Sequence, residues 1–349
     1  MIRPAPHLLG FLLPVIVVWS ATLGGAATFL ALAYPFVLVP LVDAVAPRNM
    51  RNAAAGDRAA LEASAGYRLV TWVWVPVQIA LIGWLAASAA RGQFAPLGLA
   101  GLIVSVGVTT GAIGITFAHE LIHRPGAFER ALGEVLLASV SYTHFAIEHV
   151  YGHHRHVATP RDPATARFGE SVYTFYPRTV FGSLASALRI ERDRLGRRGL
   201  PAWHPLNRFW RYGAEQALLY GAVWAAAGAG AAAAVAAQAV VAFSLLEVIN
   251  YVEHYGLERA RRADGSYERV SPRHSWDSSH RMSNWVLINL ARHADHHARA
   301  ARRYQALDHL DEAPQLPAGY GTMFLVALVP PLWRRVMDPR AARSTVRGS

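Results

Sequence analysis

The sequence predicts an all-α membrane protein with about six transmembrane helices and a histidine-rich cap on one side of the membrane. Hydrophobic residues make up 53% of the 349 residues and the mean hydropathy is +0.20, which is more apolar than an ordinary soluble domain. Long apolar runs recur along the chain and alternate with four clusters of histidine. We therefore expect one membrane-embedded domain over residues 1–349.

The apolar runs set the expected spans, because about 20 apolar residues are needed for a helix to cross a bilayer. These spans are residues 8–23, 25–45, 69–90, 96–118, 215–231 and 233–250. The first two form a hairpin broken at Gly24-Gly25, in preference to a cleaved signal peptide. The last two form a hairpin broken at Gly228-Ala229-Gly230; one long helix with a re-entrant piece is the alternative.

The charge of the chain indicates its orientation. The formal net charge is +11, and all 34 basic residues are arginines spread over several loops, so we expect no nucleic-acid partner. With Arg3 inside, the arginine-rich loop 46–68 and the parts 119–214 and 251–337 all lie inside as well. The positive-inside rule therefore places both termini and every histidine cluster in the cytoplasm, and membrane lipid is an expected partner. Residues 338–349 are expected to form a disordered tail.

The histidine clusters predict a metal centre. His119-Glu120-Leu121-Ile122-His123 places two histidines on one helix face; such a motif alone is most familiar from zinc proteases. The same spacing predicts that His149 and His153 share a helix face, with His154 beside them. In the fourth cluster, His293, His296 and His297 are likewise expected to lie on one helix face. The nine candidate ligands are His119, His123, His149, His153, His154, His254, His293, His296 and His297.

Nine imidazoles brought together would repel one another when protonated, and metal binding keeps them neutral. Nine nitrogens are too many for one zinc ion and suit two metals with four or five nitrogens each. Imidazole alone does not distinguish iron, copper, zinc and nickel, whereas the absence of cysteine excludes thiolate sites.

Acidic residues beside the ligands are expected to hold the free ring N–H groups and so fix the orientation of the imidazoles: Glu120, Glu148, Glu253 and Asp295. The other histidines are expected to be non-ligands: His7, His144, His156, His204, His274, His280 and His309.

These clusters resemble those of the membrane-bound alkane monooxygenases (alkane hydroxylases). The likeness includes Asn250-Tyr-Val-Glu-His254-Tyr-Gly256 and Arg292-His-Ala-Asp-His-His297, and it extends to Val157-Ala-Thr-Pro-Arg-Asp-Pro163 and Pro272-Arg-His-Ser-Trp276. It covers most of the chain. In the fourth cluster, Ala291 and Ala294 stand where the family usually has Gln and Ser, so a hydrogen bond near the metal is expected to be missing.

The resemblance implies two histidine-ligated iron ions, O2 as co-substrate, and oxidation of the terminal methyl group of an n-alkane to a primary alcohol. It implies electrons from a rubredoxin that is reduced by an NAD(P)H-dependent reductase. Because this chain has no cysteine, that rubredoxin must be a separate protein. A bacterial-type inner (cytoplasmic) membrane is the implied location.

An alkane has no polar group, so its binding site must be an apolar channel. Counting back along the helices from the ligands, together with the bulky residues of the spans, gives the candidate lining: Val108, Ala112, Ile115, Phe243, Leu246, Asn250 and Trp72. Ordinary helix packing is the alternative for each, as it is for the glycine pair Gly107 and Gly111.

A cytoplasmic arginine set is the candidate docking surface for an acidic rubredoxin, with topology determinants and lipid contacts as the alternative: Arg189, Arg192, Arg194, Arg197, Arg198, Arg261 and Arg262.

Other functions remain open at this point. A fatty-acyl desaturase, or a methyl hydroxylase of fatty acids or alkylaromatics, would use similar histidine clusters. A membrane zinc protease would use only His119, Glu120 and His123. A metal transporter would need several ionisable residues inside the spans, where the sequence offers chiefly Asp43 and Glu247.

Overall fold

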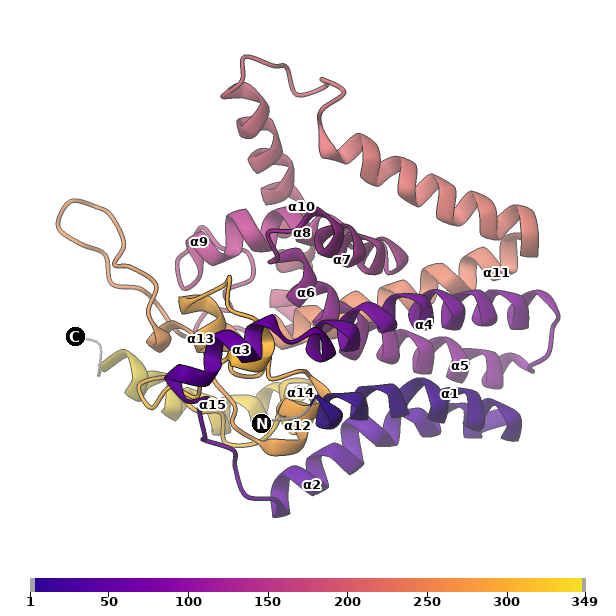
Figure 1. Cartoon of the computed structure of the whole chain (residues 1–349), viewed down its shortest axis with the longest axis horizontal. Helices are drawn as coiled ribbons and strands as arrows, with labels where there is room; N and C mark the ends of the chain where they lie inside the picture. The colour runs from indigo at the N-terminus through magenta and orange to yellow at the C-terminus, as the bar shows by residue number, and fades with distance from the viewer. Residues whose placement is uncertain (1–3, 347–349) are drawn as a thin grey trace. The chain divides into compact units, whose positions relative to one another are not determined.

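The computed structural model describes residues 4–346 (Figure 1). Arg3, which entered the orientation argument, and residues 347–349 lie outside this described part. Within it the regular secondary structure is helical, and β pairing is limited to two isolated bridges, Arg261 with Tyr267 and Asp277 with Gln315. The predicted all-α membrane fold is confirmed.

The chain forms two compact units. Unit 1 comprises Met1–Pro35, Ala65–Ile147 and Ala187–Leu246, and unit 2 comprises Phe36–Ser64, Glu148–Ser186 and Glu247–Ser349. Each unit is assembled from segments far apart in the sequence. The single domain expected from the sequence stays a prediction, and the units are described separately.

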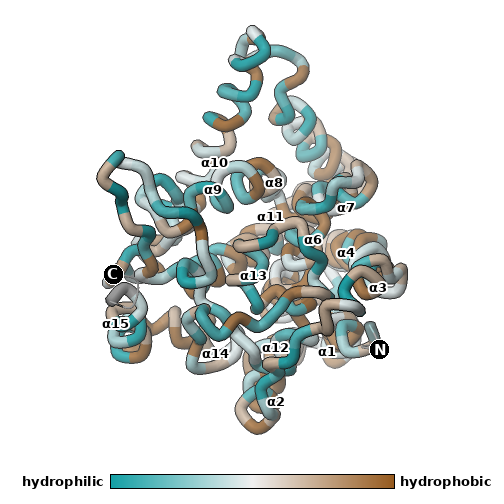
Figure 2. Tube along the Cα trace, turned by 60° about the vertical axis from the view of Figure 1, so that its left-hand side comes forward, coloured by the Kyte–Doolittle hydropathy of each residue, from teal (hydrophilic) through white to brown (hydrophobic). Residues whose placement is uncertain are grey.

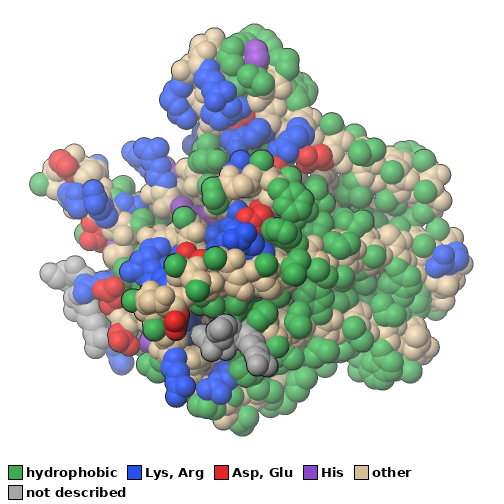
Figure 3. Space-filling view, in the orientation of Figure 1, with side chains coloured by type: hydrophobic (Ala, Val, Ile, Leu, Met, Phe, Trp, Pro, Cys, Tyr) green, Lys and Arg blue, Asp and Glu red, His purple; other side chains and the backbone are tan. Residues whose placement is uncertain are grey.

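Unit 1 contains most of the long apolar helices. Its helices are η1 (Ala5–Phe11), α1 (Leu12–Leu23), η2 (Gly25–Leu32), α4 (Ala65–Ala90), α5 (Pro96–Thr109), η5 (Thr110–Ile115), α6 (Thr116–Ile122), α7 (Ala127–Ser139) and the larger part of α11 (Arg208–His254). The helix α8 (Phe145–Glu148) and the long α10 (Val172–Gly196) continue from one unit into the other. Hydrophobic side chains dominate the surface over α1, α4 and α5 in Figure 3, as lipid-facing helices require.

The structure contains four helical candidates for membrane spans, or five if a bent pair is counted. The four are Ala5–Leu23, Ala55–Ala90, Pro96–Ile122 and Arg208–His254, and the pair is Gly25–Leu32 with Tyr34–Val45, bent by 40°. The count is lower than the six expected because the spans predicted at 215–231 and 233–250 are counted together as α11, and the span predicted at 25–45 is the bent pair. The α11 helix is interrupted at Gly228, whose φ of 82° is left-handed, and Figure 1 shows it changing direction sharply.

Two glycines let α5 and η5 pack directly against α11 within unit 1. A Cβ atom added at Gly107 would lie 2.5 Å from Cβ of Val241, and one added at Gly111 would lie 2.7 Å from the carbonyl oxygen of Ala242. No side chain fits in that space. Gly107 and Gly111 therefore allow the helices to pack closely, which is the role that their spacing in the sequence suggested.

Unit 2 contains short helices joined by ordered loops. They are η3 (Tyr34–Leu38, beginning in unit 1), α2 (Val39–Val45), η4 (Ala55–Asp57), α3 (Arg58–Ala63), η6 (His149–His153), α9 (His154–His156), η7 (Pro272–His274), α12 (Arg281–Val286), α13 (His293–Ala298), η8 (Tyr304–Ala306), α14 (Tyr320–Ala327) and α15 (Pro330–Val346). A core of large aromatic side chains joins several of them and includes Tyr251, Tyr255, Trp276 and Trp333.

The C-terminal segment is helical where disorder was expected. α15 runs to Val346, and the described part of the predicted tail 338–349 belongs to it. Asp338 accepts a hydrogen bond of 2.5 Å from the Tyr255 hydroxyl, and Ala341 is fully buried in the aromatic core. These contacts hold the helix in place, and a sequence rich in arginine does not reveal them.

Candidate metal centre

Four histidines of unit 2 form one compact group, called here the four-histidine group: His153, His254, His293 and His297. All four are buried, and their potential ligand atoms lie within 4.8 Å of one another. The Nε2 atoms of His153 and His297 are 3.2 Å apart, those of His293 and His297 are 3.0 Å apart, and those of His254 and His293 are 3.2 Å apart.

These distances fit one bound metal ion. Two nitrogens bound to a metal at roughly 2.1 Å lie about 3.0 Å apart when the bonds meet at a right angle. Hydrogen bonding explains the arrangement less well. Nε2 of His297 lies close to the Nε2 atoms of both His153 and His293, whereas a single N–H at that nitrogen can point toward only one of them. Burial and the neighbouring histidines hold the pKa of His297 well below its usual value, so its ring is neutral and can bind a metal.

Three further histidines of unit 2 form a second set, the three-histidine group: His149, His154 and His296. Nε2 of His154 lies 3.0 Å from that of His149 and 3.1 Å from that of His296. His149 and His296 are buried, whereas His154 is half-buried. The same donor chemistry is thus present a second time, with three nitrogens and greater access to solvent.

A π-helical turn decides how the second cluster is divided. Because α-helical spacing was assumed, His149 and His153 were expected to share a face. Instead, η6 is a π-helix over His149–His153, and the amide N–H of His154 donates to the carbonyl oxygen of His149. This wider turn brings His149 and His154 together and directs His153 into the other group.

The fourth cluster is also divided between the two groups. In α13, His293 and His297 are four residues apart and belong to the four-histidine group, whereas His296 belongs to the three-histidine group. The expectation that all three face one way is therefore corrected. One short helix supplies ligand atoms to both groups.

His119 and His123 belong to unit 1, at the end of α6. Their ring centroids are 5.2 Å apart, as a spacing of four residues on a helix predicts. His119 is buried and His123 is half-buried. Glu120 follows His119 in the sequence, and its carboxylate lies 3.5 Å from the guanidinium of Arg124.

One carboxylate near the histidines was missed in the sequence. Oδ2 of Asp162 lies 2.9 Å from Nδ1 of His153, and it also accepts a hydrogen bond of 2.6 Å from the Thr165 hydroxyl. Burial opposes ionisation of Asp162, but His153 and the two hydrogen bonds outweigh it and keep the pKa of the carboxyl below its usual value. Asp162 was visible only as part of the motif 157–163, with no role attached.

Two predicted carboxylates take positions other than those expected. Oε2 of Glu253 lies 3.3 Å from Nε2 of His293, the nitrogen that faces the other histidines, while its Oε1 accepts a 2.7 Å hydrogen bond from Tyr320. Glu253 is thus placed to face a metal itself. Asp295 is buried and pairs with Arg299 and Arg302, at 2.5 and 2.8 Å. Glu148 is buried beside His149.

Residues that are not metal-ligand candidates hold α13 in position. The Ala294 amide donates a 2.8 Å hydrogen bond to Oδ1 of Asp277, whose pKa burial raises to about 7. The side chain of Arg292 is buried and donates to the carbonyl oxygens of Leu307, Asn49 and Arg51. Ala291 and Ala294 are both fully buried.

Histidines expected to be non-ligands make other contacts. His274 lies 3.1 Å from Glu268, His280 lies 2.9 Å from the Ser278 hydroxyl, and His309 lies 2.7 Å from the Ser279 hydroxyl. None of them belongs to either histidine group in the described part of unit 2.

The candidate channel residues are mixed in character. Val108 and Ile115 are buried, Ala112 and Leu246 are half-buried, and Phe243 stacks on Tyr142 at a centroid distance of 5.0 Å. The other two make polar contacts. Trp72 donates a 3.3 Å hydrogen bond to Glu129, and the amide of Asn250 donates a 3.2 Å hydrogen bond to Glu247.

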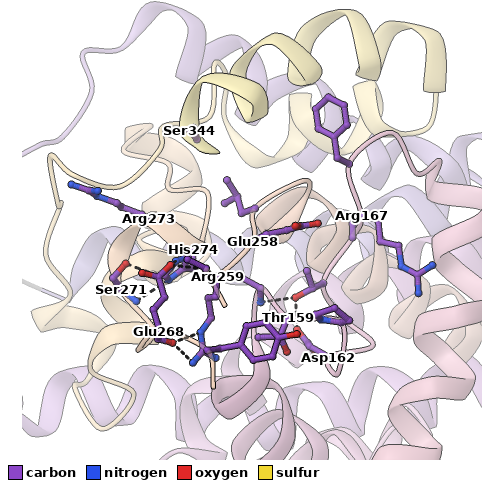
Figure 4. Close-up of a pocket in the computed structure, with 18 of the residues that line it drawn as sticks. Thr159, Asp162, Arg167, Glu258, Arg259, Glu268, Ser271, Arg273, His274 and Ser344 are labelled. Atoms are coloured by element: carbon purple, nitrogen blue, oxygen red, sulfur yellow. Dashed lines mark hydrogen bonds and ion pairs between the residues drawn. The ribbon is translucent and has the colours of Figure 1, made fainter. Parts of the chain in front are cut away.

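A pocket of about 1040 Å³ lies in unit 2, and Figure 4 shows many of its residues. The arginines that line it are Arg167, Arg178, Arg259, Arg261 and Arg273. Arg178 is paired with Glu170 at 2.7 Å, and the side chain of Arg259 is bound by the backbone oxygen of Glu268. Asp162, which contacts His153, also lines this pocket, so this one residue links the pocket lining to the four-histidine group.

The helical membrane fold and the paired histidine groups define a polytopic membrane protein with a histidine-rich metal centre. In agreement, a family model described as fatty acid desaturase matches residues 92–327. Alkane 1-monooxygenase 1 of Pseudomonas aeruginosa is 46% identical over 308 residues, which cover 87% of this chain and 80% of that protein.

Two further relatives agree. Alkane 1-monooxygenase 2 of Pseudomonas aeruginosa is 44% identical over 317 residues, covering 89% of this chain and 83% of the relative. Alkane 1-monooxygenase of Acinetobacter baylyi is 40% identical over 304 residues, covering 87% and 74%. The chain belongs to the alkane 1-monooxygenase family, a family of enzymes.

Proposed function

We propose that this protein hydroxylates the terminal methyl group of n-alkanes, using O2 and two iron ions held by its histidines. The reaction balances as RH + O2 + 2 electrons + 2 protons giving ROH + H2O. The observation that carries the proposal is the convergence of seven histidines in unit 2 into two groups with metal-binding spacing. A zinc protease built on His119 and His123 would leave these seven unexplained.

The four-histidine group would hold one iron and the three-histidine group the other. Three nitrogens are a small set for a metal that commonly takes more ligands, and we propose that His119 and His123 also serve as iron ligands. Their spacing on α6 supports this role, since both rings can face one ion. Bound iron supplies the activation of O2, and the protein supplies orientation and the exclusion of water.

Around these ligands, Asp162 fixes the orientation of the His153 ring through Nδ1, which leaves Nε2 to face the group. Tyr320 donates to Oε1 of Glu253 and directs its other oxygen toward His293. We propose that Glu120 and Glu148 orient the ligands beside them in the same way. Asp295, which pairs with arginines, would instead fix α13.

The substrate would enter from the bilayer through an apolar channel lined by Val108, Ala112, Ile115, Phe243 and Leu246. Their apolar character and their positions on helices that lead toward His119 and His254 support this. Trp72 and Asn250 were candidates too, but their polar contacts suit positions at the ends of such a channel better than along it.

The electron donor would be a separate rubredoxin, reduced by an NAD(P)H-dependent reductase. We propose that the donor binds at the arginine-lined pocket of unit 2, because Asp162 connects that pocket to His153. Arg261, part of the docking surface suggested by the sequence, lines the pocket and Arg262 follows it. An acidic partner would be steered there by charge.

The protein would lie in a bacterial-type inner membrane with both termini in the cytoplasm. The arginines of the loop 46–68 and of residues 119–214 and 251–337 support this orientation.

The proposal is tested by the metal content and activity of the protein in detergent or nanodiscs. We expect two irons per chain and conversion of octane to 1-octanol with rubredoxin, its reductase and NAD(P)H. His156→Ala serves as the matched control, since this histidine follows the second cluster but belongs to neither group. A protein that holds one zinc, and keeps it when His293, His296 and His297 are replaced, would contradict the proposal.

The docking site is tested separately. Arg261→Glu combined with Arg273→Glu should raise the KM for the electron donor by about tenfold and reduce its salt dependence. Arg197→Glu combined with Arg198→Glu carries the same change of charge in unit 1 and should leave that KM unchanged. The reverse result would place docking on unit 1.

A further inference from the structure

The connection between α10 and α11 has an ordered structure of its own. We call residues 191–211, all in unit 1, the hairpin tip. Glu191 is fully buried there, and its carboxylate accepts hydrogen bonds from Arg194 at 2.6 Å and from the side chain and amide of Arg208 at 2.8 Å each. Asn207 donates to the carbonyl oxygen of Ala202 at 2.7 Å. The end of α10 is thus fastened to the beginning of α11.

This ordered tip displays large apolar side chains. Trp203 is 75% exposed, Leu206 is 54% exposed and Trp210 is 61% exposed. They are held together, because Nε1 of Trp210 donates a 3.2 Å hydrogen bond to the carbonyl oxygen of Trp203. Fixed apolar side chains on a surface indicate a partner that covers them.

Arginines accompany these side chains. Arg192, Arg197 and Arg198 are exposed, and among the described residues Arg192 pairs with Asp193, which is also exposed, at 3.3 Å. The side chains of Arg197 and Arg198 make no hydrogen bond or ion pair with the residues that the structure describes. Figure 3 shows the arginines and the hydrophobic side chains gathered at this end of unit 1, and Figure 2 shows the same mixture along the trace.

The tip is continuous with a membrane-spanning candidate. Arg208 is both part of the tip and the first residue of the apolar helix Arg208–His254. Farther along that helix, Leu218 and Trp224 are exposed as well. A segment that directly precedes a span lies at the level of the lipid headgroups, where tryptophan and arginine are both favoured.

We propose that the hairpin tip is an interfacial anchor that inserts Trp203, Leu206 and Trp210 into the headgroup layer of the cytoplasmic leaflet. Arg197 and Arg198 then contact the phosphates of anionic lipids. An acidic redox protein is the weaker candidate for this surface, because charge complementarity leaves its three large apolar side chains unexplained. Arg197 and Arg198, which the sequence suggested as part of a docking surface, would thus bind lipid.

The absence of cysteine in the chain makes a direct test simple, since one introduced cysteine is labelled uniquely. Leu206→Cys and Trp203→Cys would each carry a fluorescent label, in otherwise complete protein reconstituted in nanodiscs with or without anionic phosphatidylglycerol. Ala263→Cys, in an exposed loop of unit 2, is the aqueous control, and Val15→Cys, exposed on α1, is the lipid-facing control. Iron content shows that each variant is folded.

We expect nitroxide attached to lipid near the headgroup to quench the labels at 203 and 206 at least about twofold more than the label at 263. Arg197→Gln combined with Arg198→Gln should remove any increase in this quenching that phosphatidylglycerol produces. Two outcomes would overturn the proposal. In the first, iodide in the aqueous phase quenches the labels at 203 and 206 as strongly as the label at 263. In the second, added rubredoxin protects these labels from iodide and lipid does not.

Discussion

The two histidine groups differ in how completely unit 2 builds them. The four-histidine group is buried at all four positions, and carboxylates contact two of its rings: Asp162 at His153 and Glu253 at His293. The three-histidine group has only three nitrogens from unit 2, and one of them, on His154, is half-buried. Both groups draw on the same two segments, η6 and α13.

This difference suggests a division of roles. A group whose ligands and supporting carboxylate come from one unit is set by the folding of that unit, and its metal is shielded from water. A group that needs further ligands holds its metal less firmly and loses it more readily. We therefore expect unequal metal affinity, with the tighter iron in the four-histidine group.

Replacing one ligand of each group gives the largest expected effect. His297→Ala should remove one iron and His154→Ala the other, and each should abolish alkane hydroxylation, because the proposed reaction uses both irons. Iron analysis together with Mössbauer spectra of the remaining ion would show that different irons are lost. If both variants lose both irons, the groups form one inseparable site and the comparison fails.

Asp162→Asn should weaken metal binding by about 10- to 100-fold in the four-histidine group alone, because it removes the charged acceptor that orients His153. A competition titration with a chelator measures this. Thr165→Val is the matched control, since it removes one hydrogen bond to Asp162 and keeps the carboxylate. Equal weakening of both irons would show that Asp162 acts on the fold of unit 2 and not on one group.

Partial chelation of the wild-type protein should remove the irons in order. The iron at the three-histidine group should leave first, because His154 is half-buried while every member of the other group is buried. The rate of each loss can be followed by spectroscopy as the chelator is added. Simultaneous loss, or loss from the four-histidine group first, would contradict the inferred difference.

Replacing Asp277 should have a small effect on both histidine groups, since Asp277 holds α13 in place and α13 supplies histidines to both. Asp277→Ala removes the acceptor of the Ala294 amide and should lower the free energy of unfolding by about 1–3 kcal/mol. Asp277→Asn keeps an acceptor and should cost less. Thermal unfolding of the iron-free variants provides the measurement.

The same position gives a pH dependence. Burial raises the pKa of Asp277 to about 7 from its ordinary 3.8, so between these values the folded protein keeps a proton that the unfolded chain releases. The stability that this proton contributes is present below about pH 4 and is lost as the pH rises through 7. Asp277→Asn should therefore gain stability relative to the wild type between pH 5 and pH 8, and a constant difference would exclude this role.

The membrane class and the set of histidines from which the two groups are drawn could be predicted from the sequence. Apolar runs of spanning length follow directly from composition, and histidines at spacings of three to five residues point to metal binding whatever the fold. The break in α11 was also readable, because Gly228 and Gly230 interrupt an otherwise continuous run of helix formers.

How the histidines are divided between the two groups could not be predicted without the three-dimensional structure. A π-helical turn at His149–His153 cannot be read from spacing, because the same five residues in an α-helix would pair His149 with His153. Asp162 reaches His153 through a loop, and Arg302 reaches Asp295 from beyond the end of α13. Local spacing fixes which side chains can meet along one helix, whereas contacts between segments distant in the sequence fix which of them do.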